Sequence, residues 1–154
     1  MKKKVLYSTI VLLLFICCKD DITNCDNFEG SFINAERIDG LDCEILSGIS
    51  DENLIINSLE ELQSKINCNK DTIYDLDFSN YTLLVGNVEL PWCCKPEYDQ
   101  TVKVDCQNNT ISYNIKIFEP EEYYAAVSTF TYYAIVPKIQ ANFKVVFKEE
   151  ITLN

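Results

Sequence analysis

The stretch TVKVDCQNNTISYNIKI, residues 101–117, holds two alternating segments separated by the short polar run QNN at 107–109. Every second residue on either side of that run is apolar, and a period of two is typical of strands that bury one face. Asparagine tolerates the left-handed backbone that tight turns require. The stretch therefore predicts a β-hairpin whose buried face carries Val102, Val104, Cys106, Ile111, Tyr113, Ile115 and Ile117.

Further strands are predicted on both sides of this hairpin. DLDFSNYTLLVGNVEL, residues 75–90, indicates a turn and then a strand over 81–88, and its apolar run Leu83 to Val85 is typical of burial on both faces. DLDFSN also begins like a calcium loop, but Asn80 and Gly86 stand where such a loop needs glycine and glutamate, which favours a plain turn. STFTYYAIVPKI at 128–139 and NFKVVFKEEI at 142–151 predict two more strands.

The segment IINSLEELQSKI, residues 55–66, predicts the helix of the chain. Ser58 and Glu61 form a capping-box pattern, and Leu59, Leu62 and Ile66 recur at helical spacing. Residues 31–51 show no sustained period and are expected to be extended loop or short strand. The resulting expectation is a single α+β domain over 31–154, with one amphipathic helix packed on a mainly antiparallel β-sheet and stabilised by disulfides.

The first residues, MKKKVLYSTIVLLLFICC, have the pattern of a bacterial lipoprotein signal peptide. Three lysines precede an apolar run from Val5 to Ile16, which is shorter than the roughly 20 residues that span a bilayer. A lipoprotein needs a thiol directly after this run, with a compact residue before the cleaved bond. Cys18 follows the compact Cys17, whereas Cys17 follows the bulky Ile16. We therefore expect residues 1–17 to be removed and Cys18 to be lipidated, with Cys17 as the alternative.

Residues 18–30 are expected to form an acidic tether between the lipid and the domain. The run Lys19-Asp20-Asp21 resembles the export tag of Bacteroidota lipoproteins, which places them on the outer face of the outer membrane, and it is equally typical of a solvated tether. The expected location is the bacterial outer membrane, exposed at the surface or on the periplasmic side.

The net charge narrows the class of partner. The leader carries three of the 13 basic residues, so its removal leaves 10 basic against 24 acidic residues and a net charge of −14. Nucleic acids and anionic lipid heads depend on Lys and Arg for binding, so neither is an expected ligand.

Six cysteines remain after lipidation of Cys18, and this even number favours disulfides in an oxidising compartment. PWCCKPEYDQTVKVDC lacks the CxxC spacing of a zinc knuckle, so no metal site is expected. Adjacent cysteines rarely bridge each other, so Cys93 and Cys94 are expected to reach separate partners. We expect Cys106 to pair with one of them and the other to pair with Cys25, Cys43 or Cys68.

The sequence contains no histidine, which removes the usual general base for a serine or cysteine nucleophile. No phosphate loop or catalytic turn is present. We therefore expect a non-catalytic binding or accessory module without a cofactor, and a hydrolase based on paired carboxylates is the enzymatic alternative. Aromatic residues in loops suit binding, so Trp92, Tyr123 and Tyr124 are the candidate contact residues.

The order IINSLEELQSKI, LDFSNYTLLVGN, an alternating hairpin, TYYAIVPKI and FKVVF resembles the C-terminal domain of the PrcB family of protease-complex lipoproteins and related Bacteroidota lipoproteins, over about 54–151. The resemblance implies a lipid-anchored accessory role and a narrower alternative, a subunit or inhibitor of an exported protease. The chain departs from the family at PWCCKPEYDQ, where the family has a glycine-rich turn.

Overall fold

The computed structural model describes residues 32–33, 43–46, 53–68, 73, 75–121 and 124–153. The expected signal peptide, the lipidation candidates Cys17 and Cys18, the tether with Cys25, and Tyr123 lie outside these residues.

Nine strands and one helix form in the described part of the chain. In order along the sequence they are β1 (Phe32–Ile33), β2 (Cys43–Ile45), β3 (Asn53–Ile56), α1 (Leu59–Lys65), β4 (Ile66–Cys68), β5 (Tyr81–Leu90), β6 (Glu97–Asp105), β7 (Thr110–Phe118), β8 (Ser128–Pro137) and β9 (Lys144–Thr152). Most strand pairs are antiparallel, which confirms the predicted α+β class with one short helix.

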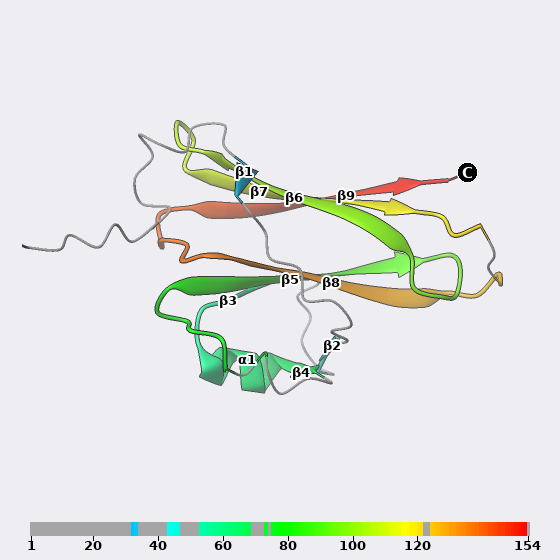
Figure 1. The fold of residues 1–154 in the computed structure, drawn as a ribbon, viewed down its shortest axis with the longest axis horizontal. Coiled ribbons are helices and arrows are strands. Elements are labelled where there is room, and N and C mark those ends of the chain that lie inside the picture. Colours follow the sequence, from blue (N-terminus) through cyan, green and yellow to red (C-terminus); the bar gives the residue numbers. More distant parts are fainter. Residues whose placement is uncertain are drawn as a thin grey trace, which may run out of the picture.

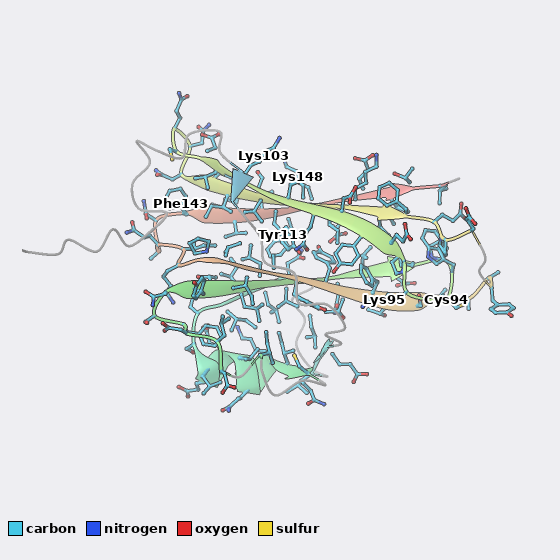
Figure 2. All side chains as sticks on the ribbon, viewed as in Figure 1. Cys94, Lys95, Lys103, Tyr113, Phe143 and Lys148 are labelled. Atoms are coloured by element: carbon cyan, nitrogen blue, oxygen red, sulfur yellow. The ribbon has the colours of Figure 1, made fainter. Side chains whose placement is uncertain are left out.

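The described strands form three sheets instead of the single sheet that the sequence predicts: a two-stranded sheet of β2 and β4, and two larger sheets that are stacked (Figure 1). A four-stranded sheet has the order β1-β6-β7-β9, and a three-stranded sheet has the order β3-β5-β8. The main core lies between them, and Figure 2 shows Tyr113 in this space. A second core lies between the other face of the three-stranded sheet and the layer that contains α1 and β4.

Strand β5 is the central strand of the three-stranded sheet, and it is buried on both faces as its apolar run predicts. Leu84 packs into the main core, while Leu83 and Val85 point the other way into the second core. Such a strand needs apolar residues at consecutive positions, because water reaches neither face.

The predicted helix forms with its predicted cap. Ser58 Oγ accepts the Glu61 N–H at 3.1 Å, and the Glu61 carboxylate accepts the Asn57 N–H at 2.8 Å. Leu62 is buried in the second core, but Leu59 is 41% exposed, so the apolar face is narrower than predicted.

The predicted hairpin is β6 and β7. Its apolar face from Val102 to Ile117 is buried in the main core, and the turn has Asn109 at φ 47°, a left-handed conformation that asparagine tolerates. The stretch DLDFSN is a turn, in which the Asp77 carboxylate accepts the backbone N–H of Ser79 at 3.0 Å.

Strand β9 pairs with β7 in parallel, with Tyr113 opposite Phe147. The parallel pair arises because β8, which follows β7 in the chain, belongs to the three-stranded sheet and not to the four-stranded one. The next strand, β9, is again in the four-stranded sheet, where it runs in the same direction as β7.

Candidate functional site

Two loops meet at one end of the stacked sheets. The strand registers pair Leu90 with Ser128 and Glu97 with Phe118, so the end of β5, the start of β6, the end of β7 and the start of β8 all lie at this end. We call residues 91–96 the thiol loop and residues 119–127 the tyrosine loop. Figure 2 shows Cys94 and Lys95 of the thiol loop at this end of the molecule.

The two loops are joined by two hydrogen bonds between Cys93 and Tyr124. The Cys93 N–H donates to the Tyr124 carbonyl at 3.0 Å, and the Tyr124 N–H donates to Cys93 Sγ at 3.4 Å. The Ser128 hydroxyl also donates to the Trp92 carbonyl, at 2.5 Å. Tyr124 is therefore held by Cys93 through both its N–H and its carbonyl.

Trp92 anchors the thiol loop and is not available as a contact residue. Its side chain is 1% exposed and packs into the main core. An indole directly after a buried strand end can turn inward and cover the edge of the core, which stabilises the fold more than exposure to water does. The prediction that Trp92 contributes to a contact surface is therefore wrong.

Cys93 and Cys94 face each other. Their Sγ atoms are 2.8 Å apart, and both are free thiols. The expectation that they point to separate partners is wrong, and so is the expected pairing of Cys106 with one of them. The reason is Cys94, whose φ of 77° interrupts the alternation of side chains that an extended backbone would produce.

The hydrogen bonds of this pair make the two thiols unequal. The hydrogen bond from Cys94 lowers the pKa of Cys93 below its ordinary value, and the Tyr124 N–H lowers it further. The same thiol–thiol hydrogen bond raises the pKa of Cys94. Cys93 is therefore the more nucleophilic partner at neutral pH, because the thiolate is the reactive form.

Among the described residues of the tyrosine loop, two large hydrophobic side chains are exposed to solvent. Tyr124 is 79% exposed and Val127 is 72% exposed. Tyr124 is one of the predicted contact residues, and its position is compatible with that role. Val127 is not among them, although its place in the run YYAAV, directly before a strand, is a signal in the sequence.

A pocket of about 410 Å³ lies beside the thiol loop, lined by Lys95, Pro96, Glu97, Tyr98, Asp99 and Phe118. Glu97 and Asp99 are both exposed on the same side of β6. A general acid needs apolar surroundings that keep it protonated beside an ionised partner. Glu97 and Asp99 are both open to solvent, so neither has apolar surroundings of this kind, and the pocket gives the carboxylate hydrolase no support.

In the described ranges, no group of three or more Cys, Asp or Glu side chains is arranged to hold a metal ion. No helix within the described part is long and apolar enough to cross a membrane.

The comparisons with known proteins add no assignment: no family model matches the sequence, and neither a curated protein nor a solved structure matches it. The similarity to the PrcB lipoproteins therefore stays a prediction.

Proposed function

We propose that this chain is a lipid-anchored lipoprotein of the bacterial cell envelope whose stacked-sheet domain binds another exported protein through the tyrosine loop. The predicted signal peptide at residues 1–17, directly before Cys18, supports the anchor. The acidic net charge favours a protein partner with cationic groups over a nucleic acid.

The observation that carries the binding role is Tyr124. It is 79% exposed, yet Cys93 holds its backbone through two hydrogen bonds. A tyrosine held in this way loses little conformational entropy when a partner covers it, and it offers both apolar area and a hydroxyl. Val127 adds apolar area in the same loop.

The domain is further proposed to be stapled by disulfides outside the thiol loop. Cys43 and Cys68 are directly opposite each other in the antiparallel pair β2–β4. Opposed residues in such a pair have Cα atoms about 4.5–5.5 Å apart, which is within the range of a disulfide. Cys68 and Cys106 carry no free thiol. A Cys43–Cys68 bridge leaves Cys25 for Cys106, and each bridge should contribute about 2–4 kcal/mol.

The anchor is tested by replacing each candidate cysteine in turn. Cys18→Ser should release the protein from membranes and abolish palmitate labelling, while Cys17→Ser should leave both unchanged. The opposite pattern would show that Cys17 carries the lipid. Loss of neither property in either variant would contradict the lipoprotein assignment.

The binding role is tested with a photo-cross-linking amino acid placed at Tyr124 in the anchored chain. As a matched control, the same group is placed at Glu60. This residue is exposed on α1, which covers the face of the three-stranded sheet that points away from the four-stranded sheet. A defined cross-linked species is expected from position 124 alone, and purified domain should compete it away. Equal cross-linking from both positions, or none from position 124, would contradict the proposal. A protease in the cross-linked species would favour the narrower role of protease subunit or inhibitor.

A further inference from the structure

The thiol loop places the sulfur atoms of Cys93 and Cys94 close together, although two cysteines that bridge to separate partners need no such contact. The Sγ atoms of Cys93 and Cys94 are 2.8 Å apart, and a disulfide bond is about 2.05 Å long. A shift of less than about 1 Å between the sulfurs would therefore close the bond.

The backbone around the pair is held in place on both sides. Pro91 and Pro96 flank the loop, Trp92 is buried, and the Cys93 N–H is bonded to the Tyr124 carbonyl. Cys94 has a φ of 77°, which a residue with a side chain seldom adopts. Strained backbone of this kind often marks functional positions. Here it turns the Cys94 thiol toward Cys93.

We propose that Cys93 and Cys94 form a redox-active vicinal disulfide. This modification site lies in the thiol loop, whose Cys93 is hydrogen-bonded to Tyr124. Cys93 is half-buried and Cys94 is exposed, so a small disulfide in solution can reach the pair. The lowered pKa of Cys93 makes it the attacking thiol, in agreement with this geometry.

The chemistry balances as two thiol–disulfide exchanges with an external low-molecular-weight disulfide, R–S–S–R. The Cys93 thiolate attacks one sulfur of R–S–S–R, which forms a mixed disulfide at Cys93 and releases R–S⁻. Cys94 then loses its proton to solvent and attacks Cys93 Sγ. The Cys93–Cys94 bond forms and the second R–S⁻ leaves. The protein loses two hydrogen atoms, and the external disulfide is reduced to two thiols.

In the cell this exchange rests on the proposed export, because export places the loop in an oxidising compartment. The test uses purified protein without the leader, so its outcome does not depend on the location of the chain. Failure of the anchor experiment and failure of this one are therefore distinguishable.

The sequence allows a direct test by trypsin digestion. Trypsin cuts after Lys70 and Lys103, and the peptide 71–103 contains Cys93 and Cys94 as its sole cysteines. Cleavage after Lys95 is hindered by Pro96, and it would leave both cysteines in one piece. Cys25, Cys43, Cys68 and Cys106 each fall in a different tryptic peptide, so every other pairing joins two peptides.

The purified chain is equilibrated with oxidised glutathione, blocked with N-ethylmaleimide and digested without reductant. Mass spectrometry should find peptide 71–103 unlinked, unblocked and lighter by two hydrogen atoms than its reduced form. Two blocked thiols in this peptide after equilibration would overturn the proposal. A link from it to any other cysteine peptide would overturn it equally.

Two serine variants test the order of attack. Cys94→Ser should accumulate the mixed disulfide of glutathione at Cys93, and Cys93→Ser should react with glutathione disulfide several-fold more slowly at Cys94. Equal rates, or faster reaction in Cys93→Ser, would overturn the assignment of Cys93 as the attacking thiol. Trp92 fluorescence checks that both variants keep the packed loop, since it is the sole tryptophan and is buried.

Discussion

The Tyr132 ring lies over Gly86 on the neighbouring strand, so Gly86→Ala should destabilise the fold strongly. The two residues are directly opposite each other in the β5–β8 pair. A Cβ added at Gly86 would lie 2.6 Å from Tyr132 Cε2 and nearer still to Cζ and the hydroxyl. The ring therefore has to move. Its hydroxyl donates to the Glu149 carboxylate at 2.6 Å, and that hydrogen bond would be strained or lost.

The magnitude follows from these contacts. Overpacking of a core costs about 1–3 kcal/mol, and a hydrogen bond to a charged group contributes about 1.5–3 kcal/mol. Replacement of glycine by alanine offsets about 0.4–1 kcal/mol by restricting the unfolded chain. We expect a net loss of about 2–4 kcal/mol in the free energy of unfolding.

Urea unfolding followed by Trp92 fluorescence measures this loss, because the single tryptophan is buried in the same core. The second variant is Tyr132→Leu, and the third combines both substitutions. Leucine removes the ring and the hydroxyl, so the added methyl group of Gly86→Ala should cost much less in the double variant. A Gly86→Ala midpoint equal to that of the parent, or strictly additive costs in the double variant, would refute the close-contact argument.

Three smaller predictions test the cap, a buried hydroxyl and a buried phenol. Ser58→Ala should lower the free energy of unfolding by about 1 kcal/mol through loss of the helix cap, while Ser64→Ala on the exposed face of α1 should change it by less than about 0.5 kcal/mol in the same urea titration. Thr82→Val should cost about 1–3 kcal/mol, because the fully buried Thr82 hydroxyl accepts the backbone N–H of Ile139 at 3.0 Å and valine leaves that donor unpaired. Burial raises the pKa of Tyr113 above its ordinary value of 10.0. The stability that depends on this protonated phenol is therefore complete below about pH 10 and is lost as the pH rises further. In Tyr113→Phe, the free energy of unfolding should fall less steeply above about pH 10 than in the parent.

The sequence predicts the elements whose signals are local. The hairpin β6–β7 follows from strict alternation, β5 from its continuous apolar run, and the cap of α1 from Ser58 with Glu61. In each case the burial or the hydrogen bond is set by residues only a few positions apart. Local patterns of this kind indicate which face of a helix or strand is apolar, but they do not indicate which other element packs against that face.

The arrangement of sheets depends on contacts that are distant in the sequence, and the sequence does not predict it. An apolar face on β8 packs equally well in one continuous sheet or in a second stacked one. The choice is visible only in the pairing of β8 with β5, which are separated by the whole β6–β7 hairpin. The parallel pairing of β7 with β9 is a consequence of that choice.

The direction of the two thiols could not be read from the sequence, because it depends on a single backbone angle. In an extended segment Cys93 and Cys94 would point to opposite sides, and bridges to two distant cysteines would be the natural outcome. The φ of 77° at Cys94 reverses this. Pro91 and Pro96 bracket this loop, and its tryptophan is buried in the main core. The burial of Trp92 thus links the main core to the thiol pair, and through the Cys93 backbone it also fixes the position of the exposed Tyr124.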